Sequence, residues 1–262
     1  MTAGPAEIEI HDVSSKVIPM ILDDLLDSLD ANVPVDKIVI GAYWCAVVSR
    51  SCGLSSAFRE PCPAHHRFPV RKAGDLLPAG GRDLANLATS DRLLEAAVGM
   101  AAINSLLSPD LSSAVERNAG DLIAERGAGK NVAIVGNFPF VPRVAETARE
   151  LWVFERPADP DRHQLDEAKM PEVLPMADIA GITGTSLINH TLDGILTMLR
   201  PDCFTVLIGP TTPLSPLLFD HGVDVLAGSV VTDPEKTLAC VSQGAIFRQM
   251  QGVSHVTLEK EA

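Results

Sequence analysis

The spacing of apolar residues divides the chain into two parts that differ in hydrophobic periodicity. Apolar side chains recur every three to four positions in residues 13–29, which predicts an amphipathic helix. Two mostly apolar, β-branched runs follow at residues 38–40 and 44–48, and we expect two strands with a turn or bulge at Gly41 between them. Residues 52–83 are rich in Gly, Pro, Ser and Arg, so we expect them to be irregular.

A second helix is predicted over residues 91–107, with Ser90 as its N-cap. Asn104 lies seven residues after Ala97, so both side chains project from the same, apolar face of this helix. A buried carboxamide needs hydrogen-bond partners. Two interpretations remain open: Asn104 bonds the backbone of a loop, or it points inward to a ligand.

The hydrophobic periodicity changes within residues 120–129, after which short apolar runs alternate with helical patterns. The expected strands are 131–135, 151–154, 177–182, 204–208 and 223–226, and the expected helices are 141–149, 186–199, a short one near Leu217, and 235–243. This alternation predicts βαβ units with right-handed crossovers. We therefore predict an α/β protein, in which residues 126–262 form a Rossmann-like, mainly parallel sheet with helices on both faces, preceded by a smaller α+β domain in residues 1–125.

Composition fits such a fold and excludes several kinds of partner. Of the 262 residues, 46% are apolar but only 4% are aromatic, so the core must be aliphatic, as in helices packed over a parallel sheet. The net charge is −13 and Lys and Arg do not cluster, so we expect no binding to nucleic acid. The apolar runs are shorter than the ~18–20 residues that span a bilayer, so we expect no membrane insertion.

Cysteine usage and the first residues indicate a cytoplasmic protein. The five cysteines are irregularly spaced and odd in number, unlike the disulfide framework of a secreted protein. The first residues lack the basic region and apolar run of a signal peptide. Cys203 and Cys240 are interpreted as small core residues. The sequence is also compatible with a homodimer.

Candidate ligand-binding residues follow each expected strand, because ligands of open α/β sheets bind beyond the carboxyl ends of the strands. The first strand is followed by Gly136-Asn137-Phe138-Pro139 and a helix. A glycine there lets the backbone approach a ligand, and the amides of a helix N-terminus attract anions. The loop is not a G-x-G-x-x-G motif, which disfavours conventional binding of NAD.

The next two strand ends carry polar side chains. Glu155 follows the second strand, at the place where nucleotide-binding relatives hold ribose hydroxyls, and it is otherwise a solvated or ion-paired carboxylate. Thr183, Gly184 and Thr185 follow the third strand, with Asn189 in the first turns of the expected helix. Hydroxyls and free amides suit a carboxylate or phosphate, although ordinary capping of the helix explains part of this pattern.

The fourth strand ends in a stiff loop, residues 209–216, that contains Gly209, Pro210, Thr212 and two further prolines. Rigid loops at the carboxyl edge of a sheet preorganise a binding site.

A separate cluster, Cys62, His65 and His66, offers soft metal ligands close together in sequence. Zinc sites pair closely spaced ligands with a second pair at a set distance, and no such pair is present in the sequence. A surface loop is therefore the simpler interpretation, with a metal site as the alternative.

Five motifs occur in an order that resembles the putative heavy-metal-chelation family of prokaryotic proteins, over roughly residues 10–250. They are Gly99-Met100-Ala101-Ala102-Ile103-Asn104, Val135-Gly136-Asn137-Phe138-Pro139, Ile182-Thr183-Gly184-Thr185 with Asn189-His190-Thr191-Leu192, Ile208-Gly209-Pro210-Thr211-Thr212-Pro213-Leu214, and Gly222-Val223-Asp224-Val225-Leu226-Ala227-Gly228. The resemblance implies an enolase-N-terminal-like domain, a Rossmann-like domain, and an active site in the cleft between them. That cleft would bring together Asn104, Gly136, Phe138, Glu155, Thr183, Asn189 and Thr212.

Direct chelation by these positions is poorly supported by their chemistry. They are mostly Gly, Thr, Asn and Pro, whereas soft metals prefer thiolate and imidazole. A transition metal carried by a small chelator, or an enzyme that makes or modifies such a chelator, fits better.

Two functional hypotheses follow, both with a small-molecule ligand. The first is a binding protein or enzyme of metal homeostasis, with an anionic or metal-chelating ligand in the interdomain cleft. The second is a Rossmann-type enzyme that uses a nucleoside cofactor, either S-adenosylmethionine or a nucleotide, with Glu155 on the ribose. Glu155 and His190 are the candidate general acids or bases, with a solvated surface position as the alternative for His190. An interaction scaffold without chemistry is disfavoured by the stiff polar loops.

Overall fold

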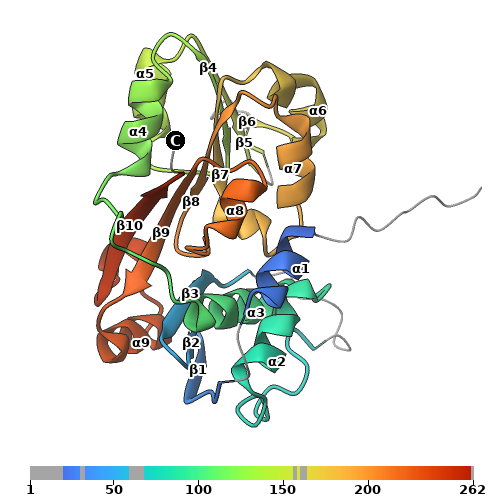
Figure 1. Cartoon of the computed structure of the whole chain (residues 1–262), viewed down its shortest axis with the longest axis vertical. Coiled ribbons are helices and arrows are strands. Elements are labelled where there is room, and N and C mark those ends of the chain that lie inside the picture. Colours follow the sequence, from blue (N-terminus) through green and yellow to red (C-terminus); the bar gives the residue numbers. More distant parts are fainter. Residues whose placement is uncertain (1–19, 30–32, 59–67, 156–157, 160–163, 261–262) are drawn as a thin grey trace, which may run out of the picture.

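The computed structural model of the chain describes residues 20–29, 33–58, 68–155, 158–159 and 164–260. These residues form two β-sheets with their covering helices (Figure 1). The smaller sheet has three strands in the order β1-β2-β3, and the larger has seven in the order β10-β9-β8-β7-β4-β5-β6. Within the described ranges, no helix is both long and apolar enough to cross a membrane.

The small sheet is antiparallel and lies between two helices. Its strands are β1 (Lys37–Ile40), β2 (Trp44–Val48) and β3 (Cys52–Ser56), and its covering helices are α3 (Leu93–Leu106) and α9 (Pro234–Ser242). Side chains alternate along β2, so that Cys45 and Val47 join the core on the α3 side while Ala46 joins the cluster on the α9 side. The backbone of α3 passes so close to β3 that a Cβ on Gly53 would lie 2.1 Å from the carbonyl oxygen of Ala101.

The large sheet has six parallel strands and one antiparallel edge strand, β10. Its strands are β4 (Asn131–Val135), β5 (Glu150–Phe154), β6 (Gln164–Leu165), β7 (Ile179–Thr183), β8 (Phe204–Ile208), β9 (Val225–Val231) and β10 (Val253–Glu259). The remaining helices are α1 (Met20–Asp27), α2 (Gly81–Ala85), α4 (Ala119–Arg126), α5 (Val141–Thr147), α6 (Met170–Val173), α7 (Leu192–Met198) and α8 (Leu217–Asp220). Short 3-10 turns are η1 (Asn86–Thr89), η3 (Glu167–Lys169), η4 (Leu174–Met176), η5 (Gly184–Ser186) and η6 (Phe247–Gln249).

Helices cover both faces of the large sheet, as predicted. Val132 and Ile134 of β4 pack with α4 and α5, whereas Ala133 and Val135 belong to the core that contains α6, α7 and α8 (Figure 1). The same core continues through α1 and α3 to the small sheet. Two polar contacts reinforce this junction: the amide of Ile21 donates to Asp193 Oδ1 at 3.2 Å, and His221 Nε2 lies 2.8 Å from Asp24 Oδ2.

The prediction that residues 52–83 are irregular is wrong at both ends of this stretch. Residues 52–56 form β3 and residues 81–85 form α2. Cys-Gly-Leu-Ser-Ser contains no β-branched residue, so its extended conformation depends on pairing with β2 and packing under α3 rather than on intrinsic preference. Residues 59–67, which contain Cys62, His65 and His66, lie outside the described residues.

Other differences concern how elements begin and end. Ser90 is not the N-cap of α3, which is Arg92; instead, Ser90 Oγ accepts from the Arg92 amide. The expected helix 186–199 is interrupted because His190 has a φ of 59°, and α7 begins only at Leu192. After α9 the chain adds β10, which the sequence analysis did not predict. Much of the stretch 120–129 belongs to α4, which packs on the large sheet, and the division of the chain into two domains stays a prediction.

One fully buried carboxylate lies at the start of α3. The Glu95 side chain is 0% exposed, and it accepts hydrogen bonds from Ser90 Oγ at 2.7 Å and from the guanidinium of Arg71 at 2.7 Å. Burial by itself raises the pKa of Glu95, but the hydrogen bonds from Arg71 and Ser90 outweigh it, and the pKa lies below its usual value.

We expect Glu95→Gln to lower the free energy of unfolding by ~1–3 kcal/mol, because an uncharged amide cannot satisfy both Arg71 and Ser90. Since the folded pKa of Glu95 is depressed, its contribution is present at neutral pH and is lost as the pH falls through that folded pKa. Urea unfolding of both proteins from pH 7 to pH 3 measures this, and the two curves should converge at low pH. Asp27→Asn, which affects an ion pair with an 86% exposed carboxylate, is the control and should change little. Equal losses for both variants would contradict the prediction.

Candidate functional site

A cavity of about 750 Å³ lies where the carboxyl ends of β4, β7 and β8 face the small sheet. Its described lining includes residues from β2 and β3, from the start of α4, from the loops after β4, β7 and β8, and from β9 and β10. The loops after the strands contribute Asn137, Phe138, Phe140, Thr183, Thr185, Gly209, Pro210 and Thr211.

The position of this cavity follows from the topology of the large sheet. From β4 the chain moves to one side through β5 and β6, and it then crosses to the other side of β4 for β7, β8 and β9. The crevice between the ends of β4 and β7 is therefore the topological switch point, where doubly wound sheets bind ligands. The two loops touch there: a Cβ on Gly136 would lie 3.0 Å from Thr183 Cβ. Gly136 and Gly209 have φ values of 113° and 111°, which favour glycine.

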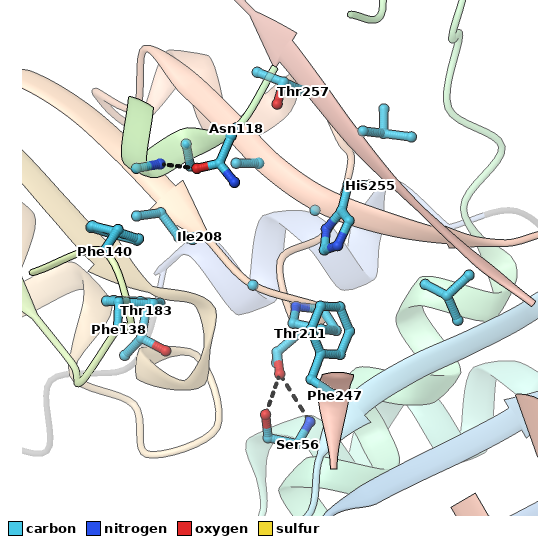
Figure 2. A pocket seen from close by; sticks show the side chains of 18 of the residues that line it. Ser56, Asn118, Phe138, Phe140, Thr183, Ile208, Thr211, Phe247, His255 and Thr257 are labelled. Carbon is cyan, nitrogen blue, oxygen red and sulfur yellow. Dashed lines mark hydrogen bonds between the residues drawn. The ribbon is translucent and has the colours of Figure 1, made fainter. Parts of the chain in front are cut away.

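Aromatic rings border the cavity on two sides (Figure 2). Phe138 and Phe140 stack with ring centroids 5.0 Å apart and an interplanar angle of 14°. On the other side, Phe247 lies 5.4 Å from the ring of Trp44 and 5.1 Å from that of His255. Such ring pairs provide large, rigid apolar surfaces that suit flat or ring-containing ligands.

The loop after β8 is fixed to the small sheet. Thr211 is 1% exposed, and its Oγ1 accepts from the Ser56 amide at 3.0 Å and donates to Ser56 Oγ at 3.3 Å (Figure 2). Asn104 Nδ2 donates to the carbonyl oxygens of Leu54 at 2.8 Å and of Thr211 at 3.2 Å. The side chain of Asn104 thus makes the backbone contacts that the sequence analysis considered, and they join α3, β3 and the loop.

The structure brings six of the predicted site residues to the lining of this cavity: Asn137, Phe138, Thr183, Thr185, Gly209 and Pro210. Gly136 lies against two of them, Phe138 and Thr183. Asn104 and Thr212 line a second, smaller cavity instead. Pro139, Gly184, Glu155 and Asn189 line neither cavity.

Three of these four residues have contacts elsewhere in the structure. Gly184 is packed beneath the loop after β8, where a Cβ would lie 2.7 Å from the amide nitrogen of Thr212. Glu155 follows β5, is half-buried, and its amide donates to Leu165 at 3.4 Å. Asn189 Oδ1 accepts from the hydroxyl of Thr191 at 2.7 Å. The roles predicted for these residues in ligand binding stay predictions.

His190, the second candidate acid or base, points to a neighbouring turn. Its Nε2 lies 2.8 Å from the carbonyl oxygen of Ala88 in η1, and it does not line the large cavity.

Several lining residues were missed in the sequence analysis, chiefly Trp44, Ser56, Phe247 and His255. Phe247 and His255 belong to η6 and β10, and the β-branched residues within 253–258 were the available signal for that strand. Trp44 and Ser56 come from the ends of hairpin strands whose approach to the large sheet is a tertiary effect.

The ionisable side chains of the described lining are Glu116, which is exposed, Arg117 and His255. Arg117 is paired with Glu125 at 2.6 Å and with Glu259 at 3.5 Å. At the start of α4, Asn118 Oδ1 accepts from the Gly120 amide at 2.8 Å and therefore caps the helix. His255 is the imidazole of the described lining.

The described residues do not fit a directly bound heavy metal. Among them, no group of three or more His, Cys, Asp or Glu side chains is placed to hold an ion. Burial raises the pKa of Cys45 to about 12 and the pKa values of Cys52 and Cys203 to about 11, which keeps these thiols protonated at neutral pH. Cys203 is a core residue as predicted, whereas Cys240 on α9 is only half-buried.

Comparison with known proteins places the chain in a family. Residues 118–260 match the DUF364 family, whose description is putative heavy-metal chelation. The chain belongs to this family. Residues 22–107 match a second family with the same description, DUF4213. An uncharacterized protein of Methanocaldococcus jannaschii is 30% identical over 185 residues, which cover 68% of this chain and 71% of that protein.

Two solved structures of DUF364 proteins of unknown function share the fold. The protein from Desulfitobacterium hafniense has a TM-score of 0.80 and 25% identity, over 93% of this chain and 99% of its own. The protein from Pyrococcus horikoshii has a TM-score of 0.76 and 24% identity, over 93% and 99% of the respective chains. These similarities confirm the predicted fold class and the predicted family.

We expect Gly184→Ala to lower the free energy of unfolding by ~1–3 kcal/mol, because the new methyl group must displace the backbone at Thr212. Gly194→Ala, in α7, is the matched control: nothing lies within 4 Å of its Cβ position, so it should raise stability by ~0.5–1 kcal/mol. Thermal and urea unfolding measure both effects. Similar changes for the two variants would show that the loop after β8 is not packed against Gly184.

A second prediction concerns thiol reactivity. At pH 8 we expect Cys45, Cys52 and Cys203 to react with iodoacetamide ~100-fold or more slowly than Cys240, because burial raises their pKa values and restricts access. Pulse labelling followed by peptide mass spectrometry measures each rate, and the urea-unfolded chain serves as the control in which the rates become similar. Fast labelling of any of the three buried thiols in the native protein would contradict this.

Proposed function

We propose that this protein binds a small metal-chelating molecule, or its metal complex, in the 750 Å³ cavity between the two sheets. The observation that carries the proposal is the chemistry of the lining. In a family described by heavy-metal chelation, the described lining offers aromatic rings, hydroxyls and amides rather than a set of metal ligands. A metal would therefore reach this cavity already held by an organic ligand.

The size of the cavity supports an organic ligand. Pockets for small molecules commonly enclose ~300–1,000 Å³ and combine apolar walls with a few polar groups that orient the ligand. Here the ring pairs Phe138–Phe140 and Trp44–Phe247 form the walls, while Asn137, Thr183 and Thr185 supply polar groups at the switch point. The same arrangement serves a binding protein or an enzyme that makes or modifies the chelator.

A nucleoside cofactor is the second candidate. The location at the switch point favours it, because nucleotides bind there in doubly wound sheets. The position of Glu155 outside the lining weakens the ribose contact on which that hypothesis depends.

The experiment compares ligand classes by thermal shift and calorimetry on the purified chain. The probes are Ni²⁺, Cu²⁺ and Zn²⁺ alone, the same ions as complexes with carboxylate and amino-acid chelators, and S-adenosylmethionine and ATP. We expect stabilisation by at least one chelate, reaching ~2.7 kcal/mol at ~100 times its Kd, and none by the free ion at equal concentration.

Matched variants locate the site. Phe138→Ala should weaken chelate binding at least ~10-fold, because it removes one wall of the cavity. Phe68→Ala, at a phenylalanine that is 71% exposed and outside the lining, should bind like the wild type. Binding of bare ions that Phe138→Ala leaves intact would refute the proposal, and a response only to adenosine compounds, lost in Glu155→Ala, would establish the second candidate instead.

A further inference from the structure

A second cavity, of about 60 Å³, lies behind the loop after β8. It is lined by the first residues of β3, the end of α3, the loop after β8, and the second half of β9. Thr211 and Thr212 are consecutive residues with opposite roles: Thr211 lines the large cavity, and Thr212 lines the small one. The loop is therefore a thin wall between the two spaces.

Three buried polar atoms on residues that line this small cavity have no hydrogen-bond partner within the described protein. They are Asn104 Oδ1, Thr212 Oγ1 and Ser229 Oγ. In the described part of the chain only four buried side-chain polar atoms lack a hydrogen-bond partner, and three of the four belong to residues that line this cavity. Buried polar groups of native proteins nearly always have hydrogen-bond partners, so three unpaired groups around one cavity indicate that a polar molecule binds there.

The strand edges around the cavity point to the same conclusion. The Gly209 amide bonds the Ala227 carbonyl, so alternate residues of β9 direct their backbone groups toward β8. The last β8–β9 pair is Ile208↔Ala227. The backbone groups of Ser229, two residues further along β9, therefore point to the same side but lie beyond the end of β8, and Ser229 lines the cavity. On the opposite side, Leu54 of β3 directs its carbonyl outward to Asn104. Two strand edges face this space without a ladder between them.

We propose that the small cavity is a water site in which about two ordered water molecules bridge Asn104, Thr212 and Ser229. The volume of about 60 Å³ exceeds the ~10–15 Å³ that one water needs, and a buried water needs two to four polar partners, which these side chains and a neighbouring water supply. Asn104 Nδ2 donates to Leu54 and Thr211, which fixes the orientation of the carboxamide and leaves the acceptor Oδ1 for a water, which is a suitable donor.

The residues that line the small cavity do not suit a charged ligand. Among the described residues, the lining contains hydroxyl, amide and apolar groups, such as those of Leu107, Leu214 and Val231, but no Asp, Glu or His. A divalent cation would lack carboxylate ligands and charge compensation. The thiol of Cys52, whose pKa burial raises to about 11, also stays neutral.

This water site makes Asn104 a positioning residue rather than a ligand contact. The waters fix one end of its carboxamide, and the other end holds Leu54 of β3 and Thr211 of the loop. The same loop places Gly209 and Pro210 at the large cavity. The link to ligand binding rests on the proposed function, whereas the water site and its effect on the loop do not.

A crystal structure at a resolution that shows water is the direct test. We expect two density peaks within hydrogen-bond distance of Asn104 Oδ1, Thr212 Oγ1 and Ser229 Oγ. A dry cavity, or rotamers that bond these three groups directly to one another, would overturn the proposal. So would one peak with five or more short contacts to oxygen together with a melting temperature that depends on K⁺ or Na⁺.

Variants test the coupling to the loop through hydrogen exchange. The Ser56 amide, which donates to Thr211 Oγ1, reports the attachment of the loop. Thr212→Val and Ser229→Ala should each speed its exchange at least ~10-fold, and the double variant should add little more, since both groups share the same waters. Thr197→Val and Ser242→Ala, at exposed hydroxyls of α7 and α9, are the matched controls and should leave it unchanged.

If Thr212→Val does not fold, the exchange of the Ser56 amide in Ser229→Ala and the electron density of the wild-type protein still test the water site. Unchanged exchange in Ser229→Ala would remove the positioning role. These readouts need no ligand, so they can succeed even where the chelate experiment fails.

Discussion

The attachment of the loop after β8 to the small sheet is the contact on which the candidate site depends. Thr211 bonds Ser56 of β3, and Asn104 of α3 bonds both Leu54 and Thr211. These bonds hold the loop against the small sheet, beside the apolar core that the two sheets share. With them, residues from two sheets line one cavity, so the shape of the candidate site and the packing between the halves are linked properties of the molecule.

The elements that could be predicted from the sequence are those with their own local signal. Strands such as β4 and β8 are continuous apolar runs, and topology then places their following loops at one edge. β3 was missed because Cys-Gly-Leu-Ser-Ser owes its conformation to neighbours, and with it Ser56 was missed as a site residue. Glu155 is off the lining because β5 lies one strand away from the switch point, and Asn189 because its side chain closes a local turn on Thr191.

The description of the DUF364 family and the chemistry of the cavity agree only if the metal is not bound directly by the described side chains. Heavy metals need thiolates or imidazoles in a convergent set. In this protein the described buried thiols are protonated and separate, and His255 is the imidazole of the cavity. Flat aromatic walls beside neutral oxygen and nitrogen groups instead suit the organic part of a metal complex.

The connection between β9 and β10 has a consequence for biosynthesis. Helix α9 leaves the large sheet to cover one face of the small sheet, where Val241 packs among Ala46 and Leu54. During synthesis, residues 37–56 emerge from the ribosome long before residues 234–242 are made. That apolar face therefore stays exposed to solvent until residues 234–242 have been made, and the small sheet reaches its final packing only after that.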